Sequence, residues 1–202
     1  RDRSVSRGLG DVYKRQSFNC SPFSGDELER VEKNQTLLFQ SLSQAPRHLI
    51  IPFQTHGTKI LPVDEKFLGA SGQQQQEMLN GIDALITTEP GCCICISTAD
   101  CIPVLLYDRV HHAVAAVHAG WRGTVEYIVG HTLEKMRAVF GTEGQDVIAC
   151  IGPGISLQSF EVGDEVYEAF RLNGFDMSRI SFRHSVTHKY LSLIHISEPT
   201  RH

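Results

Sequence analysis

The stretch VAAVHAGWRG, residues 114–123, decides how this chain folds, because it lies where an apolar segment ends and a segment with helical spacing begins. The preceding run HHAVAAV is apolar and typical of a buried strand, and the following TVEYIVGHTLEKMRAVF has apolar residues at helical spacing. Between them, HAGWRG (residues 118–123) holds a histidine, a tryptophan, an arginine and two glycines. This pattern predicts a strand followed directly by a helix. The junction lies at the end of the strand, where protein scaffolds commonly place functional groups.

Two other segments share this design, in which an apolar strand ends in a reactive side chain beside a glycine or proline. They are IPFQTHG with His56 and ISTADCIP with Asp100 and Cys101. Together with His118 they offer two imidazoles and one thiolate, which suit Zn²⁺ and leave a fourth position for water or substrate. The separations of 45 and 17 residues match no local metal motif. Taken singly, each residue is therefore more simply interpreted as part of the core or the surface.

The alternation of short strands with helices predicts an α/β (α+β) fold built as a layered sandwich. We expect helices over residues 24–42, 124–140 and 163–174. Ser24 or Asp26 can cap the first helix, and Gly141 can end the second. We expect strands in the apolar segments 47–53, 83–88, 92–98, 103–108, 111–118 and 146–154, and an exposed loop over the polar segment 69–81.

The cysteines indicate a reduced protein rather than a disulfide framework. Three of the six crowd into CCIC, and neighbours along one strand are poorly placed to form a disulfide. Buried thiols are the simpler account, and they favour a cytoplasmic location. We expect four of these residues in the core: Cys92, Cys93, Cys95 and Cys150.

The two ends of the chain mirror each other at the level of codons. Residues 5–16 (VSRGLGDVYKRQ) can be encoded by the reverse complement of residues 191–202 (LSLIHISEPTRH). CAG for Gln16, for example, gives CTG for Leu191, and AAG for Lys14 gives CTT for Leu193. We therefore expect residues 1–16 and 191–202 to be tails translated from a sequencing adapter. Residues 17–190 are then one domain, truncated at both ends.

The charge balance argues against a nucleic-acid partner. The whole chain has 19 Lys and Arg and 23 Asp and Glu, a net charge of −4. Residues 17–190 hold 13 of the basic and 20 of the acidic residues, a net charge of −7. A nucleic-acid surface needs clustered Lys and Arg, and the apolar runs are shorter than the roughly 20 residues of a membrane helix. We expect neither nucleic acid nor a membrane as a partner.

Four segments taken together resemble a known family. QTHG, TADCIPVLLYD, VAAVHAGWRGT and IGPGISLQSFEVGDEV, in this order, are similar to the YfiH-like family, also called laccase-domain or multicopper polyphenol oxidase proteins. The resemblance spans residues 17–190, and the pairing of HAGWRG with ADC is specific. It implies a layered α/β/β/α sandwich. It also implies that His56, Cys101 and His118, which match the family's zinc ligands one for one, bind zinc.

The activity implied by this resemblance is phosphorolysis of purine nucleosides, with adenosine, inosine, guanosine or methylthioadenosine as substrates, together with deamination of adenosine. The partners are then a nucleoside and phosphate. In such a site Arg122 offers a fork of donors suited to phosphate, and the amides of Gly123 and Thr124 could add an anion site. Asp100 could orient a ligand imidazole or pair with Arg122, or it could simply stabilise a turn.

Two other interpretations stay open at this point. One is a copper-dependent polyphenol oxidase, since copper also accepts this ligand set, although a single thiolate and two imidazoles support only one copper site. The other is a non-catalytic protein that uses a bound metal to recognise a ligand. A phosphorylase would depend on phosphate and a phenol oxidase on oxygen. A non-catalytic binding protein would bind its ligand without turnover.

Overall fold

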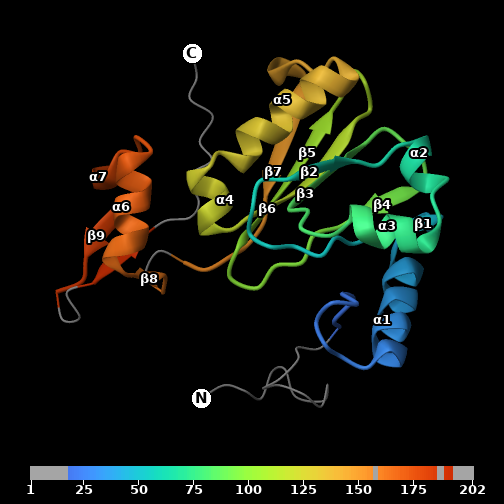
Figure 1. Ribbon diagram of the computed structural model, residues 1–202, viewed down its shortest axis with the longest axis horizontal. Helices are drawn as coiled ribbons and strands as arrows, with labels where there is room; N and C mark the ends of the chain where they lie inside the picture. Colours follow the sequence, from blue (N-terminus) through green and yellow to red (C-terminus); the bar gives the residue numbers. More distant parts are fainter. Residues whose placement is uncertain (1–17, 157–158, 186–188, 193–202) are drawn as a thin grey trace. The chain divides into compact units, whose positions relative to one another are not determined.

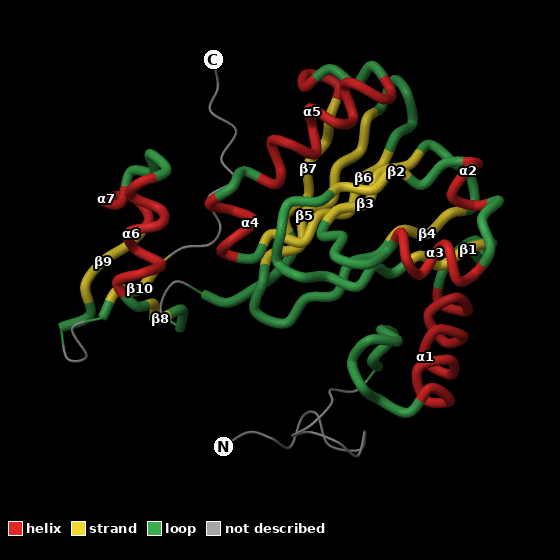
Figure 2. The backbone as a smooth tube through the Cα atoms, in the orientation of Figure 1, coloured by secondary structure: helices red, strands yellow, loops and turns green. Residues whose placement is uncertain are grey.

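The structure is a computed structural model that describes residues 18–156, 159–185 and 189–192. Figures 1 and 2 show its helices and strands. The described residues form two compact units. One contains the described residues up to Leu49 together with Gly91–Cys93, and the other contains Ile50–Pro90 and the described residues from Ile94 onward. Within the described residues, no helix is long and apolar enough to cross a membrane.

The smaller unit consists mainly of helix α1, Leu28–Ser41, which buries Val31. Strands β1, His48–Ile50, and β4, Cys92–Ile94, pair with each other. The Gly91 carbonyl accepts hydrogen bonds from the amides of Arg47 and His48. The capping prediction was wrong, because the N-cap of α1 is Glu27, which makes no side-chain capping bond. Instead, Ser24 and Asp26 hydrogen-bond Asn19 in the loop before the helix.

A five-stranded sheet forms the centre of the larger unit, with the strand order β2-β3-β6-β5-β7. β2 runs parallel to β3, and the other neighbours are antiparallel. The register places Ala84 opposite Val117 and Pro103 opposite His118. The strands are Ile60–Pro62 (β2), Ala84–Thr87 (β3), Ile102–Asp108 (β5), Val114–Ala119 (β6) and Val147–Ile151 (β7).

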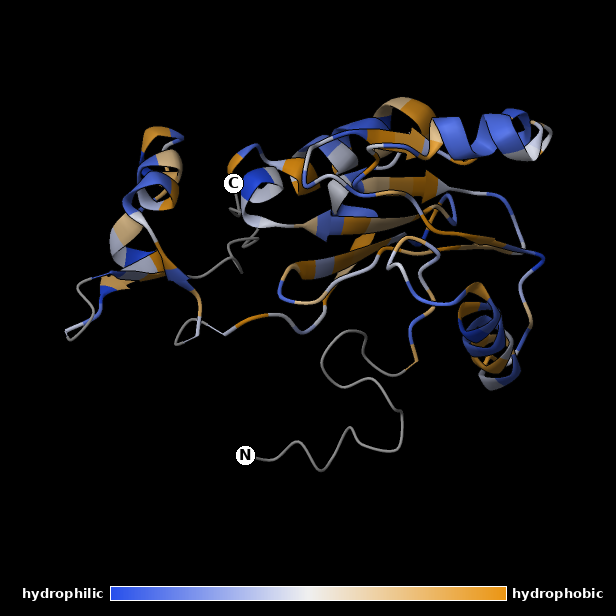
Figure 3. Cartoon of the chain, turned by 60° about the horizontal axis from the view of Figure 1, so that its bottom comes forward, coloured by the Kyte–Doolittle hydropathy of each residue, from blue (hydrophilic) through white to orange (hydrophobic). Residues whose placement is uncertain are grey.

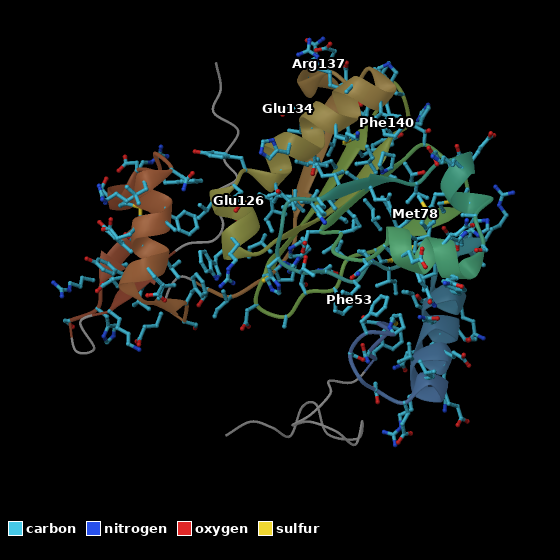
Figure 4. The ribbon with its side chains drawn as sticks, viewed as in Figure 1. Phe53, Met78, Glu126, Glu134, Arg137 and Phe140 are labelled. Carbon is cyan, nitrogen blue, oxygen red and sulfur yellow. The ribbon has the colours of Figure 1, made fainter. Side chains whose placement is uncertain are left out.

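Helix α5, Ile128–Phe140, covers one face of this sheet (Figure 1). It buries Ile128, Thr132 and Met136 against small and β-branched strand residues, so that helix and sheet approach closely. Hydrophobic residues predominate along the strands (Figure 3). Glu134 and Arg137, labelled in Figure 4, belong to the exposed side of the helix. The sheet and α5 therefore share one buried hydrophobic core.

The helix predicted over residues 124–140 is in fact two helices. Helix α4, Trp121–Val125, starts earlier and is separated from α5 by Tyr127, whose φ of 59° is left-handed. A residue in that conformation cannot continue a right-handed helix. The expected end of the second helix at Gly141, with φ of 76°, is confirmed.

Two further predictions, about the segment 69–81 and about the cysteines, were wrong. The segment 69–81 was expected to be a loop, but Gly72–Met78 forms helix α3, which Ser71 and Gln74 start with a reciprocal capping box. Helix α2, Glu65–Leu68, precedes it. Cys150 is exposed rather than in the core, and Cys92, Cys93 and Cys95 are half-buried.

The last elements of the larger unit form a three-stranded sheet with the order β8-β10-β9. They pack around a cluster that includes Val162, Val166 and Phe170. Helix α6 confirms the helix expected over residues 163–174. These elements are β8 Glu161–Val162, α6 Asp164–Leu172, α7 Met177–Ile180, β9 Ser181–Arg183 and β10 Tyr190–Ser192, and the short 3-10 helix η1, Gly144–Asp146, lies earlier, directly before β7.

Asp108, at the end of β5, is a buried carboxylate that closes the turn to β6. It accepts hydrogen bonds from the amides of Val110 and His111 and bonds His111 Nδ1 at 2.8 Å. Burial by itself raises the pKa of Asp108, but the polar influence of the Thr142 side chain and the hydrogen bonds from His111 and Val110 outweigh it and hold the pKa well below its usual range.

We predict that Asp108 contributes to stability only while it is ionised. Because its folded pKa lies below the unfolded value of about 4, its contribution is complete above that pH and is lost as the pH falls further. Urea denaturation over a series of pH values should show a free energy of unfolding that falls in acid, and falls less steeply in Asp108→Asn. Parallel pH profiles for the two proteins would contradict this assignment.

Candidate metal and nucleoside site

The structure brings together the three side chains that are predicted from the sequence to be metal ligands. His118 lies near the end of β6 and is 3% exposed, Cys101 immediately precedes β5, and His56 lies in the exposed loop between β1 and β2. One possible ligand atom from each residue lies within 4.8 Å of the others. The rings of His56 and His118 meet edge to face, with their centroids 4.8 Å apart. All three residues belong to the larger unit.

The residue that orients His118 is Asp83, which the sequence analysis missed. Asp83 directly precedes β3. The backbone amide of His118 donates a hydrogen bond to the carbonyl oxygen of Asp83, and this bond continues the antiparallel pairing of β3 and β6. The carboxylate is fully buried and lies 2.8 Å from Nδ1 of His118. Because Nδ1 is engaged by Asp83, Nε2 is the nitrogen of His118 that is free to bind a metal. The only sequence signal was an acidic residue at the start of an apolar strand.

The same carboxylate holds the loop that carries His56. The amides of Thr55, His56 and Gly57 donate to Asp83 over 3.2, 2.9 and 2.7 Å. His56 itself has a φ of 63°, a left-handed conformation that is uncommon for residues other than glycine. Three successive amides can converge on one carboxylate because the chain turns at this residue.

The loop before Cys101 is tied to the same segment by Gln54. Its side-chain amide donates to the Ser97 carbonyl over 2.9 Å, and its oxygen accepts from the Ser97 amide over 2.7 Å. These two bonds connect the QTHG segment with the segment that leads into ADC. The Gln54 side chain thus joins the loop that carries His56 to the segment that precedes Cys101.

Glycines allow the three segments to approach one another. A Cβ on Gly120 would lie 2.9 Å from Cδ2 of His56 and 3.2 Å from Sγ of Cys101. A Cβ on Gly123 would lie 3.0 Å from the Gly57 carbonyl oxygen. Gly154 packs in the same way against the ADC loop, since its Cβ would lie 2.9 Å from the Asp100 carbonyl oxygen. Both glycines of HAGWRG are thus explained by close contact with the His56 loop.

The two imidazoles have opposite pKa shifts. Burial alone lowers the pKa of His118, but hydrogen bonds with Asp83 and Cys101 outweigh it and raise the pKa to about 9. Burial lowers the pKa of His56, and the positive charges of His118 and Arg122 act in the same direction. Burial raises the pKa of Asp83, but the hydrogen bonds from His118, Gly57 and Thr55 make the net shift downward. Asp83 is therefore an anion that favours positive charge at this site.

Arg122 lies close enough to influence the charge of His56. Its side chain is exposed, and its guanidinium lies 4.3 Å from the ring centroid of Trp121. Trp121 is half-buried and packs against the core, as a structural aromatic does. The Thr124 amide is not available as an anion donor, because it donates to the Gly120 carbonyl at 2.8 Å. That part of the predicted anion site was wrong.

Asp100 lies in the exposed loop beside Cys101, and its carbonyl oxygen accepts the Ile155 amide at 2.9 Å. Among the described residues it forms no ion pair with Arg122, and the carboxylate bonded to His118 is that of Asp83. A direct role of Asp100 toward substrate stays a prediction.

The chain shares its family and its fold with known proteins. The chain belongs to the family described as multi-copper polyphenol oxidoreductase laccase, whose model matches residues 1–199. It is similar to the solved hypothetical protein YfiH of Bacillus licheniformis, with a TM-score of 0.78 and 26% identity over 89% of this chain and 67% of that one. YlmD from Geobacillus stearothermophilus has a TM-score of 0.77 and 27% identity over 90% and 68%. The expected YfiH-like α+β fold is confirmed.

Two relatives carry names that refer to purine nucleosides. A Bacteroides thetaiotaomicron protein named purine nucleoside phosphorylase is 64% identical over 174 residues, which cover 86% of this chain and 64% of the relative. A protein named adenosine deaminase RL5, from an unknown prokaryotic organism, is 37% identical over 187 residues, which cover 92% of this chain and 71% of the relative. The chain thus spans less than two thirds of the Bacteroides protein.

Substitution of Gly120 tests whether the close packing around the ligands matters. In Gly120→Ala, the new methyl group must displace the His56 ring or the Cys101 thiol, and we predict a loss of zinc affinity of about tenfold or more. Gly144→Ala is the matched control, because a Cβ there meets no heavy atom within 4 Å. Competition with a chromophoric chelator measures both affinities, and equal values for the two variants would disprove the steric requirement.

Proposed function

We propose that this protein is a zinc-dependent purine nucleoside phosphorylase that also deaminates adenosine. The observation that carries the proposal is the cluster of His56, Cys101 and His118, in a chain 64% identical to a protein named purine nucleoside phosphorylase. The relative named adenosine deaminase supports the second activity. Adenosine, inosine, guanosine and methylthioadenosine are the candidate nucleosides, and Asp100 and Arg122 are the candidate catalytic residues.

The chemistry of the three ligands fits zinc. Two imidazoles and a thiolate are common zinc ligands with bond lengths of about 2.0–2.3 Å, and small side-chain rotations suffice for donor atoms that lie within 4.8 Å of one another. Zinc held by His56, Cys101 and His118 would supply Lewis-acid chemistry and would lower the pKa of a water at the site to about 7. Three protein ligands leave a coordination position free for this purpose.

The chain's own residues supply the binding of phosphate. In phosphorolysis, a phosphate oxygen forms a bond to C1′ of the ribose, the bond between C1′ and the base nitrogen breaks, and the base leaves with the electron pair. The phosphate must therefore be held as an anion next to the ribose. Arg122 is exposed near His56, and its guanidinium presents parallel N–H donors suited to phosphate oxygens. Deamination, in which water adds at C6 and ammonia leaves, needs no such clamp.

The description of the family favours one alternative, a copper-dependent polyphenol oxidase. Among the described residues, His56, Cys101 and His118 form the only group of three or more such side chains that could hold a metal ion. One group of three ligands provides for one copper ion rather than several. Oxygen uptake in the presence of a phenol and copper would support this alternative.

Arg122→Gln tests the proposal, because it should separate the two activities. We predict that kcat/KM for phosphate in adenine release falls roughly 10- to 100-fold, which corresponds to a charged hydrogen-bonding contribution of about 1.5–3 kcal/mol. Formation of inosine without phosphate should change little. Chromatographic assay of adenine and inosine, with and without phosphate, gives both rates for the zinc-loaded chain.

The control for this experiment is Arg137→Gln. Arg137 is an equally exposed arginine on α5 whose nearest acidic partner is Glu143, 3.6 Å away. It should leave both activities unchanged. Adenine release that is independent of phosphate, or an equal fall in both activities in Arg122→Gln, would refute the phosphate-binding role. Phenol-dependent oxygen uptake with no nucleoside turnover would refute the proposed function itself.

A further inference from the structure

Asp83 makes contacts that differ in kind from those of an ordinary turn-capping carboxylate. Its four side-chain partners, Thr55, His56, Gly57 and His118, are 26 to 35 residues away in the sequence. Two of these partners are candidate metal ligands, and they lie on different segments of the chain. Asp83 therefore joins the His56 loop to strand β6 at the place where both segments supply a ligand.

Asp108 provides an internal comparison for Asp83. Both carboxylates are fully buried, both lie 2.8 Å from Nδ1 of a histidine, and both accept backbone amides. The amides and the imidazole bonded to Asp108, however, come from its own turn, two and three residues away, and the more distant Thr142 side chain, which also lowers the pKa of Asp108, is no candidate metal ligand. Its histidine, His111, belongs to no group of candidate metal ligands among the described residues. The two sites share local chemistry and differ in what they position.

We propose that Asp83 is the positioning residue of the metal site, a role that rests on the proposed metal-binding function. It does two things at once. By accepting a hydrogen bond from the N–H of His118 Nδ1, it leaves Nε2 to bind the metal. By accepting the amides of Thr55, His56 and Gly57, it holds the His56 backbone in its left-handed conformation, with the imidazole beside that of His118. Neither ligand is placed correctly without the carboxylate.

Both oxygens of Asp83 are needed because each receives two donors. Oδ1 accepts from the His56 amide and His118 Nδ1, and Oδ2 accepts from the amides of Thr55 and Gly57. An asparagine retains only one oxygen, and its NH₂ group would face two N–H donors at the other position. If NH₂ replaces Oδ2, the His56 loop loses its anchor. If NH₂ replaces Oδ1, the His56 amide has no acceptor and His118 is driven toward the tautomer with Nε2 protonated.

The experiment compares the zinc affinities of the complete 202-residue chain, Asp83→Asn and Asp108→Asn, measured by competition with a chromophoric chelator. Loss of a carboxylate that supports a ligating histidine lowers metal affinity about 10- to 100-fold, and we expect this loss in Asp83→Asn. Asp108→Asn removes an equivalent buried charge elsewhere, and its zinc affinity should equal that of the wild type. Circular dichroism of each protein verifies the fold.

A second measurement needs no substitution and so does not depend on the folding of a variant. Long-range ¹H–¹⁵N correlation spectra of the zinc-loaded wild type report which imidazole nitrogen of His118 carries a proton. We expect a protonated Nδ1 and a metal-bound Nε2. A purely structural role for Asp83 would not determine this pattern, and coordination through Nδ1 would overturn the proposal.

The outcomes separate this proposal from the proposed function. If wild type and Asp83→Asn bind zinc equally well, or if Asp108→Asn loses as much affinity as Asp83→Asn, the positioning role is overturned and the metal site stands. If the folded wild type binds no zinc, the metal site and the role of Asp83 are both overturned.

Discussion

The arrangement of the site depends on one buried carboxylate, that of Asp83. A charge out of contact with water is tolerated only when it is paired and hydrogen-bonded, and removal of one partner of such a pair typically costs about 3–5 kcal/mol. Asp83 meets this condition with three successive amides of the His56 loop and the ring of His118. The loop is thereby held in the conformation that faces β6. The electrostatic requirement of a single side chain thus brings the two imidazoles together.

Steric constraints complete the arrangement. HAGWRG begins with the last two residues of β6 and leads into α4, and its glycines lie against the His56 loop and the Cys101 thiol. Gly154, in the segment after β7, lies against the ADC loop from another direction. The HAGWRG turn therefore lies against the QTHG and ADC segments, and the IGPG turn lies against the ADC segment, so that parts of all four segments that carry the resemblance to the YfiH-like family meet. Their residue types reflect contacts among loops at the sheet edge, in addition to the chemistry of the ligands.

Much of this organisation could be predicted from the sequence, because short apolar runs and glycine turns locate strands and their ends. The candidate metal ligands could be predicted because each of them lies at or near an end of such a strand: His56, Cys101 and His118. Asp83 could not be found in this way, since it acts on distant residues through a strand register that no local pattern encodes. The capping pair of Ser71 and Gln74 was overlooked because the polar residues around it offered no apolar periodicity.

Other differences have tertiary causes. The apolar spacing over residues 124–140 is continuous, yet the left-handed Tyr127 breaks the helix there, and its hydroxyl donates to the Asn173 carbonyl at 2.8 Å. Cys150 lies on β7, an outer strand whose last four residues are all exposed, which a run of apolar residues does not reveal. The adapter tails predicted at residues 1–16 and 191–202 lie almost entirely outside the described residues and stay a prediction.

Metal content tests the central claim most directly. Elemental mass spectrometry of the purified chain should be compared with Cys101→Ser and with Cys150→Ser, whose thiol is exposed on β7 away from the three ligands. Our account predicts about one zinc ion per chain in the wild type and in Cys150→Ser, and little in Cys101→Ser. A wild-type chain shown by circular dichroism to be folded but free of zinc, or a Cys101→Ser variant that retains its zinc, would contradict it.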